Sequence, residues 1–135
     1  MIVLDTNVLS ETLRPKPSPR VLEWVRSRTA LYTTTITEAE LSYGIALLPD
    51  GKRRSLASVI ELIFAEDLAG RVLYFDSAAA RAYADVAATR RRAVRPMSES
   101  DARIAAIVRS RGAALATRNV EDFAGCDLGV VDPWL

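Results

Sequence analysis

The chain opens with Met1-Ile2-Val3-Leu4-Asp5-Thr6-Asn7, an apolar run that meets an aspartate with no polar residue before it. A short apolar run bounded by polar residues predicts an interior strand of a mostly parallel sheet. In open α/β sheets, ligands bind beyond the carboxyl ends of such strands. Asp5 is therefore a candidate functional residue, because it directly follows the first predicted strand.

The amino-acid composition restricts the chemistry that is possible here. The 135 residues include no histidine and one cysteine, Cys126. Without histidine the chain lacks the commonest general base and the commonest ligand of transition metals. Cys126 has no histidine to activate it as a nucleophile and no second cysteine for a disulfide. Any chemistry must therefore use carboxylates, whose oxygens suit Mg²⁺ or Mn²⁺.

Length and hydrophobicity predict one compact domain over residues 1–135, because half of the residues are hydrophobic. No apolar run approaches the roughly 20 residues of a membrane span, and the N-terminus does not have the pattern of a signal peptide. With its single cysteine, the chain is expected to be a cytoplasmic protein.

The formal net charge of +1 indicates no particular partner, but the charges are unevenly distributed. Residues 76–111 carry eight arginines against four acids, whereas residues 112–135 carry one arginine against four acids. An arginine-rich surface beside an acidic pocket would suit a polyanion that is brought to a metal. For any single arginine, a solvated helix face or helix end is the simpler interpretation.

Apolar periodicity and end signals predict strands that alternate with helices. Ser18 and Pro19 are typical of a helix start, whereas Gly70 and Gly112 are typical of helix ends. The predicted strands cover residues 1–4, 31–34, 72–75, 113–117 and 128–131. Predicted helices cover residues 8–13, 37–48, 52–69 and 100–111, with further helices from Pro19 and Ser77 and a basic connection over residues 90–96. This alternation predicts an α/β fold, with a parallel sheet of about five strands covered on both faces.

Glu40 lies at the start of the helix that follows the second predicted strand. The pattern Thr37-x-x-Glu40 fits a capping box, in which the glutamate bonds back to the start of its own helix. Thr35-x-x-Glu38 fits the same pattern earlier in the chain. If the upstream pair caps the helix, Glu40 is free to point into a cleft, so both interpretations stay open.

Asp101 has the same ambiguity, because Ser98-x-x-Asp101 also matches a capping box and the helix dipole favours an acid in a first turn. Asp101 and Glu40 both begin helices on the side of the sheet where Asp5 ends its strand, so the topology would bring the three acids together. Clustered carboxylates do not all ionise without a cation, and their convergence would predict bound Mg²⁺ or Mn²⁺. Such a metal lowers the pKa of a bound water and neutralises charge on a phosphodiester.

Further polar residues follow two other predicted strands. After the fourth strand come Thr117, Asn119 and Asp122. Asn119 can supply a carbonyl oxygen or orient a water, and Asp122 is the nearest acid that could act at the metal. Asp76 also ends a strand, but its simpler interpretation is the N-cap of the following helix.

Five segments together resemble one family, the PIN-domain ribonucleases, and specifically the VapC-type toxins of bacterial toxin-antitoxin pairs, close to the FitB-like branch. The resemblance covers essentially the whole chain. It implies a PIN-like three-layer α/β/α sandwich, Mg²⁺- or Mn²⁺-dependent cleavage of RNA, a homodimer, and a small DNA-binding VapB-type antitoxin in a higher hetero-oligomer. The segments are Met1-Ile2-Val3-Leu4-Asp5-Thr6-Asn7, Ile36-Thr37-Glu38-Ala39-Glu40-Leu41, Asp101-Ala102-Arg103-Ile104-Ala105-Ala106, Ala116-Thr117-Arg118-Asn119-Val120-Glu121-Asp122-Phe123 and Val131-Asp132-Pro133-Trp134.

By this resemblance, Asp5, Glu40 and Asp101 match the family's acids. Asp5 and Asp101 are then direct metal ligands, while Glu40 helps to hold the metal or orients its water. Thr6 and Asn7 match positions that support the first acid.

The chain departs from the family pattern at Asn119, where many relatives carry aspartate. That departure leaves open whether one or two metals bind, and Asp122 either compensates or only caps a turn. In the leading hypothesis, a metal-dependent endoribonuclease, Thr117 and Asn119 complete the surroundings of the metal and residues such as Arg90–Arg92 guide the RNA.

Two alternatives belong to other classes of protein. The first is a catalytically weak or inactive module that dimerises and binds an antitoxin, which the presence of Asn119 favours. The second is a phosphoacceptor signalling domain with Asp76 as the acceptor. That domain would need an acid pair after the first strand and a late lysine, whereas the only lysines are Lys16 and Lys52.

Overall fold

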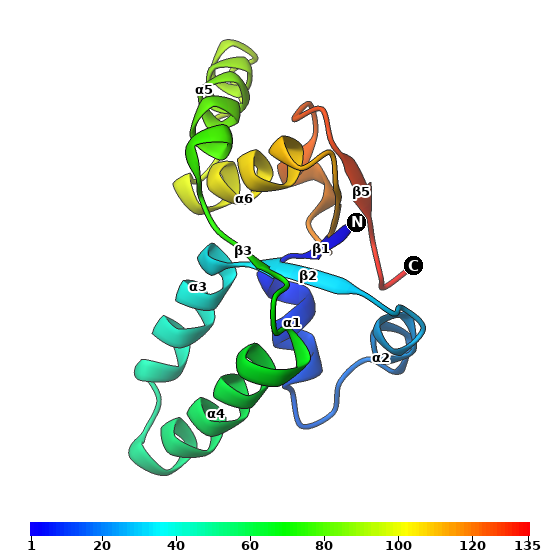
Figure 1. Ribbon diagram of the computed structural model, residues 1–135, viewed down its shortest axis with the longest axis vertical. Coiled ribbons are helices and arrows are strands. Elements are labelled where there is room, and N and C mark those ends of the chain that lie inside the picture. Colours follow the sequence, from blue (N-terminus) through cyan, green and yellow to red (C-terminus); the bar gives the residue numbers. More distant parts are fainter.

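The computed structural model describes residues 1–135 and consists of a five-stranded parallel sheet between two layers of helices (Figure 1). The strands lie in the order β3-β2-β1-β4-β5. Strand order therefore reverses direction at β1 and β4, which is the switch point where open α/β sheets bind ligands. The strands are β1 Ile2–Leu4, β2 Leu31–Thr34, β3 Val72–Leu73, β4 Ala114–Ala116 and β5 Gly129–Val131.

Six α-helices cover the sheet, which confirms the predicted three-layer α/β/α sandwich. One π-helical turn, η1 Ile63–Asp67, extends α4, and one 3₁₀ turn, η2 Val120–Phe123, follows β4. No helix combines the length and the apolar composition that a membrane span needs. The helices are α1 Thr6–Thr12, α2 Pro19–Arg26, α3 Thr35–Ala46, α4 Asp50–Leu62, α5 Ser77–Arg92 and α6 Glu99–Ser110.

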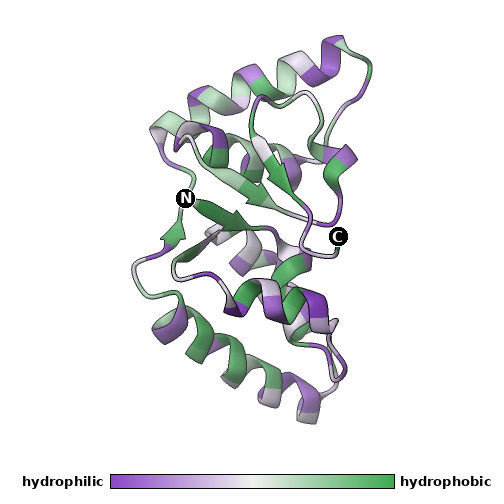
Figure 2. Cartoon of the chain, turned by 90° about the vertical axis from the view of Figure 1, so that its right-hand side faces the viewer, coloured by the Kyte–Doolittle hydropathy of each residue, from purple (hydrophilic) through white to green (hydrophobic).

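The central strands divide their side chains between two hydrophobic cores. Val3 and Leu115 pack with residues of α5 and α6, whereas Leu4 and Ala116 pack with residues of α1 to α4. Figure 2 shows the strands as a mainly hydrophobic layer between helices that carry hydrophilic residues on their outer sides. Each fully buried Val or Leu side chain contributes roughly 1.5–3 kcal/mol to stability. The side chains of β1 and β4 therefore stabilise both cores.

The register of the two central strands fixes what lies beyond them. Leu4 pairs with Ala116, and the Asp5 amide donates to the Ala116 carbonyl at 2.9 Å. The next residue on each strand, Asp5 on one and Thr117 on the other, is therefore held side by side at the carboxyl edge of the sheet.

Two predicted helix starts are confirmed. Ser18 Oγ accepts from the Val21 amide at 3.4 Å, with Pro19 at the first helical position of α2. Asp76 is the N-cap of α5 and accepts from the Ala79 amide at 2.9 Å. Because the Asp76 carboxylate serves this cap, it has the structural role that the sequence favoured.

Several predicted boundaries differ from the structure. The helix predicted over residues 52–69 is α4 followed by η1, and the strand predicted over residues 72–75 has only two paired residues. The helix predicted over residues 8–13 begins two residues earlier, at Thr6, because Asp5 caps it.

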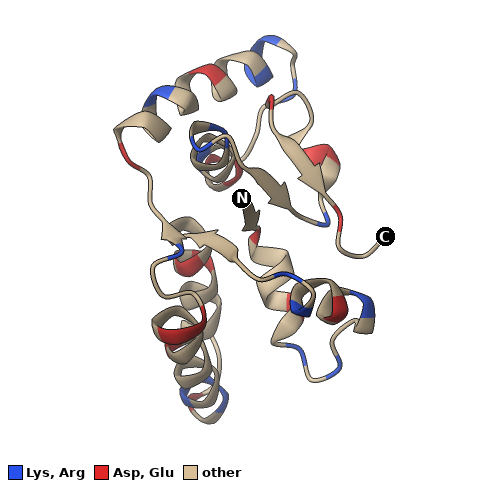
Figure 3. Cartoon of the chain, turned by 45° about the vertical axis from the view of Figure 1, so that its right-hand side comes forward, with Lys and Arg blue, Asp and Glu red and all other residues tan.

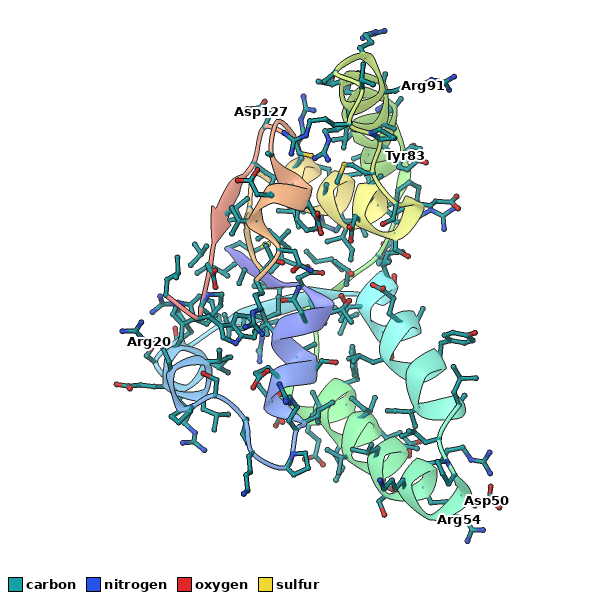
Figure 4. The ribbon with its side chains drawn as sticks, turned by 180° about the vertical axis from the view of Figure 1, so that it is seen from behind. Arg20, Asp50, Arg54, Tyr83, Arg91 and Asp127 are labelled. Atoms are coloured by element: carbon teal, nitrogen blue, oxygen red, sulfur yellow. The ribbon has the colours of Figure 1, made fainter.

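The basic connection predicted over residues 90–96 is wrong at its start, because Arg90–Arg92 form the last turn of α5. Arg90 is 7% exposed and donates to the carbonyls of Arg95, Asp122 and Ala124 at 2.7–2.9 Å. It holds the loop after β4 and does not face RNA in solvent. Arg91 projects outward near the end of α5 (Figure 4).

The other arginines of residues 76–111 form a weaker basic surface than the sequence suggested. Four of them pair with acids within 4 Å. Figure 3 shows acidic and basic residues interspersed along the helices. The pairs are Arg95 with Glu121, Arg103 with Glu99, Arg109 with Asp127 and Arg111 with Asp76.

Candidate functional site

Asp5 lies at the carboxyl end of β1, as the N-cap of α1, with only 4% of its surface exposed. Its Oδ1 accepts from the Thr6 amide at 2.8 Å. Its Oδ2 accepts from the Thr117 hydroxyl at 2.7 Å and from Asn7 Nδ2 at 3.1 Å. The carboxylate is thus fixed by donors from α1 and from the end of β4.

Burial raises the pKa of Asp5 above its ordinary value, because the charged form is removed from water. Hydrogen bonds from Thr117 and Thr6 oppose this increase, whereas the nearby charge of Glu40 adds to it. A buried acid with a raised pKa at a sheet's switch point is a feature typical of functional sites.

Asn7 joins the two strand ends into one network. Its Nδ2 donates to Asp5 and to Thr117 Oγ1, and its Oδ1 accepts from the Arg118 amide at 3.1 Å. Thr117 Oγ1 in turn accepts from the Asn119 amide at 3.1 Å. The predicted supporting residues Asn7 and Thr117 therefore both contact Asp5.

Glu40, on α3, takes no part in helix capping. Neither capping box predicted for α3 forms, because the helix is capped by an earlier residue. The N-cap is Thr34, whose hydroxyl accepts from the Thr37 amide at 3.1 Å. Glu40 Oε1 instead accepts from the Thr6 hydroxyl at 2.8 Å, and Thr6 Oγ1 lies 3.0 Å from Thr37 Oγ1. The hydroxyl of Thr6 thus links Glu40 to the residue next to Asp5.

Asp101 lies in the first turn of α6, half-buried, and forms only half of its predicted capping box. Ser98 Oγ accepts from the Asp101 amide at 3.1 Å, but the Asp101 carboxylate accepts no bond from the Ser98 amide. Burial, followed by the charge of Asp5, raises the pKa of Asp101. Asp5 and Asp101, 96 positions apart in the sequence, are therefore close enough in space for the charge of one to affect the other.

One pocket of about 470 Å³ contains all four of the predicted catalytic residues. Thr6 and Asn7 also line it, whereas Thr117 lies buried behind Asp5. Asp122 is exposed and outside the lining, although its charge contributes to the raised pKa of Asp101. The complete lining is Asp5, Thr6, Asn7, Ser10, Glu11, Arg14, Glu40, Asp101, Arg118, Asn119 and Trp134.

Sequence patterns did not predict several of the residues that line the pocket. Glu11 is buried, and its carboxylate accepts from the Ser18 amide at 2.8 Å and from Arg14 at 3.2 Å. The Ser18 bond, and then Arg14, hold the pKa of Glu11 below its ordinary value. Helical spacing would have found Glu11, because it lies four positions after Asn7 on one face of α1.

A larger hollow of about 600 Å³ lies between α3 and α4. Its lining is mainly apolar and contains none of the predicted catalytic residues. The polar pocket beside β1 and β4 is therefore the better candidate for chemistry.

The polar pocket contains carboxylate oxygens that could bind a metal ion. No three Asp, Glu or Cys side chains lie close enough together to hold an ion as a protein-only cage. Mg²⁺, however, is commonly bound through one or two carboxylates, with water and substrate phosphates completing its shell. Asp5 and Asp101, whose negative charges repel each other, fit that type of site.

Comparison with known proteins gives a consistent result. The family model described as the PIN domain matches residues 2–125. Plasmid stability protein StbB from Pseudomonas syringae pv. tomato is 44% identical over 137 residues, covering 99% of each chain. VapC ribonuclease Y4jK from Sinorhizobium fredii is 40% identical, covering 99% of this chain and 98% of the relative.

Toxin FitB from Neisseria gonorrhoeae is 38% identical over 137 residues and covers 99% of each chain. Among solved structures, FitAB bound to an IR36 DNA fragment aligns with a TM-score of 0.94 and 37% identity. That alignment covers 100% of this chain and 96% of the matched chain.

Proposed function

The chain belongs to the PIN-domain family, and on that premise we propose that it is a metal-dependent endoribonuclease and the toxin of a toxin-antitoxin pair. The names of its relatives, a VapC ribonuclease and the toxin FitB, support both parts of this proposal. The absence of histidine supports the metal dependence, because the pocket lacks the commonest general base and offers carboxylates, which suit Mg²⁺ or Mn²⁺.

The observation that carries the proposal is that Asp5 and Asp101 line the same pocket beside the carboxyl ends of β1 and β4. Each lies in a different structural layer, yet the charge of Asp5 raises the pKa of Asp101 across the pocket. Two carboxylates held in that relation repel each other at neutral pH, which a divalent cation offsets. We assign Asp5 and Asp101 as its ligands and Mg²⁺ or Mn²⁺ as the ion.

When bound, such an ion lowers the pKa of a water molecule and neutralises charge that develops on the phosphodiester. Thr6, Asn7 and Thr117 orient the Asp5 carboxylate, and its Oδ1, which accepts a single hydrogen bond, keeps a lone pair available. Glu40, fixed by the Thr6 hydroxyl, either helps to hold the ion or accepts a proton from the attacking water. Asn119 supplies a carbonyl oxygen at the opening of the pocket.

We assign one tightly held ion and not two. Asn119 carries no charge, and Asp122 lies outside the lining of the pocket. A second ion would therefore depend on Glu40 and on phosphate oxygens of the substrate, which bind it only while RNA is present.

The proposed partner is a small VapB-type antitoxin that binds DNA, in a hetero-oligomer built on a homodimer of this chain. The solved complex of FitAB with a DNA fragment supports this assignment. The alternative function, a module that binds the antitoxin without cleaving RNA, is favoured only by Asn119.

The test is cleavage of a fluorescent single-stranded RNA by the purified chain, free of antitoxin. We expect cleavage with Mg²⁺ or Mn²⁺, no cleavage in EDTA, and recovery when the ion is restored. Asp101→Asn should lose at least about a hundredfold in rate, since metal catalysis is worth several kcal/mol. Asp122→Asn, which changes an acid outside the pocket, is the matched control and should retain most of the rate. Metal-independent cleavage would contradict the mechanism, and antitoxin binding with no cleavage would favour the alternative.

A further inference from the structure

One edge of the acidic pocket is formed by an arginine packed on a tryptophan. The Arg118 guanidinium carbon lies 5.0 Å from the centroid of the Trp134 ring, and both residues line the pocket. Arg118 is exposed and Trp134 is half-buried. A cation and an aromatic surface therefore adjoin the two coupled acids, although neither has a role in the mechanism given above.

The backbone of Arg118 is held in a fixed relation to the acids. Its amide donates to Asn7 Oδ1, and the same Asn7 side chain donates to Asp5. One side chain thus separates the Arg118 backbone from the proposed metal ligand. A group that Arg118 binds would therefore lie at the edge of the pocket that contains Asp5 and Asp101.

Trp134 is also held in place by local structure. Its amide donates to Asp132 Oδ1 at 2.9 Å, and its ring packs against the core formed with Leu4 and Ala116. The preceding strand, β5, is joined to the pocket where the Thr117 amide donates to the Val131 carbonyl at 2.9 Å. A ring anchored in this way loses little conformational freedom when a ligand stacks on it.

The charge of Arg118 is not neutralised by a direct ion pair. Arg14, the other cation of the pocket, lies 3.2 Å from Glu11, whereas Arg118 has no carboxylate within 4 Å. Its guanidinium makes no hydrogen bond within the chain, so its donors are available for a ligand. A planar guanidinium with free donors is well suited to a phosphate group.

We propose that Arg118 and Trp134 form a subsite for one unpaired nucleotide of the RNA, in which the exposed guanidinium moves off the indole to bind a phosphate and the base takes its place on the ring. This inference rests on the proposed nuclease function and assigns a binding role to two residues of its pocket. Single-stranded RNA is recognised by stacking of bases on aromatic rings and arginine planes, and every base offers such a face. A base-paired nucleotide does not, because its faces are covered by its neighbours, so the subsite selects unpaired RNA.

Another tryptophan of the chain provides a control for this subsite. A second arginine-tryptophan pair lies elsewhere: the Arg28 guanidinium carbon is 4.6 Å from the centroid of the Trp24 ring. Trp24 belongs to α2 and Arg28 follows that helix, and neither lines the acidic pocket. Trp24→Leu therefore removes an indole of the same kind without touching the proposed subsite.

The test measures binding of a short fluorescent single-stranded RNA to Asp5→Asn protein, which binds without turning the RNA over, at several salt concentrations. In this background, Trp134→Leu should weaken binding by about tenfold with an unchanged salt slope, because stacking carries no charge. Arg118→Gln should reduce the salt slope by about 0.7, the value for one lost phosphate contact on a single strand. Trp24→Leu should leave affinity and slope unchanged.

Trp134→Phe shows whether a loss of affinity reflects stacking and not misfolding. It keeps a ring for stacking and should retain most of the affinity that Trp134→Leu loses. Equal affinities of Trp134→Leu, Arg118→Gln and their background would overturn the subsite, even if the parent protein cleaves RNA. Failure of the parent to cleave, with binding still lost in both variants, would instead overturn the nuclease function alone. If RNA binding were unchanged and only binding of an acidic peptide were lost, the surface would belong to a protein partner and the proposal would be wrong.

Discussion

The carboxyl ends of β1 and β3 have the same local pattern, and yet they differ in chemistry. Asp5 and Asp76 each follow an apolar strand and each cap the helix that comes next. Asp76 lies three residues after the edge strand β3, where its carboxylate serves the cap and lies 3.7 Å from Arg111. Asp5 ends a central strand, where donors and acids from β4, α3 and α6 surround it. Position in the sheet, and not local sequence, thus separates a helix cap from a candidate catalytic residue.

The largest difference between the two aspartates should appear in the cleavage rate. Asp5→Asn keeps the shape of the side chain but removes the charge that we assign to metal binding. We expect the rate of RNA cleavage in Mg²⁺ to fall by at least about a hundredfold. Single-turnover cleavage of a labelled RNA measures this effect.

Asp76→Ala is the matched change at the other strand. Loss of an N-cap costs about 1 kcal/mol of stability, which denaturant unfolding would measure, while the cleavage rate should stay within about twofold of the parent. Loss of cleavage in a folded Asp76→Ala protein would break the comparison.

A smaller effect should follow from the donors that only Asp5 has. Thr117→Val keeps the side-chain volume but removes the hydroxyl that donates to Asp5 at 2.7 Å. A hydrogen bond to a charged group is worth about 1.5–3 kcal/mol, so cleavage should slow by about tenfold. Because this bond lowers the pKa of Asp5, the acidic limb of the pH-rate profile should move to higher pH.

Thr89→Val, on an exposed position of α5, is the control for Thr117→Val and should leave the profile unchanged. An acidic limb that stays in place in Thr117→Val would mean that Asp5 does not govern the pH dependence of cleavage.

The smallest effect should be on stability against pH in the absence of divalent ions. The pKa of Asp5 and that of Asp101 are raised in the folded chain, mainly by burial, above ordinary values of 3.8. The folded state therefore holds these protons more tightly than the unfolded state does, and the resulting stability is present below about pH 4. It is lost as the pH rises through the raised values.

Thermal unfolding in EDTA at a series of pH values tests this expectation. Glu11, whose pKa is lowered, acts in the opposite sense, so the informative quantity is the difference between the parent and Asp5→Asn. We expect that difference to grow in favour of Asp5→Asn as the pH rises, and Mg²⁺ to reduce it at neutral pH. A difference that does not vary with pH would contradict the raised pKa of Asp5.

Much of the fold could be predicted from local signals. The apolar strands, the Ser18 and Asp76 caps and the alternation of strands with helices depend on short segments, and the structure confirms them. Helix starts were harder where several caps compete. Thr34, Thr35 and Thr37 all suit an N-cap, and only the end of β2 selects Thr34.

The candidate site was predictable where residues follow strands and not where they depend on register or tertiary contacts. The gathering of Asp5, Asn119 and Asp101 follows from topology, whereas Trp134 enters the pocket only through the pairing of β5 with β4. Arg90 was misread because its partners, the carbonyls of Asp122 and Ala124, are more than 30 positions away. Sequence patterns carry no information on such long-range backbone contacts.

The pairing of the first strand with β4 has a consequence for biosynthesis. Thr117, which donates to Asp5, lies 112 positions later in the chain and is therefore synthesised well after it. Until β4 has been made, β1 has a neighbour on one side only, β2, and Asp5 lacks the hydroxyl of Thr117. A growing or truncated chain that ends before β4 therefore carries no assembled pocket.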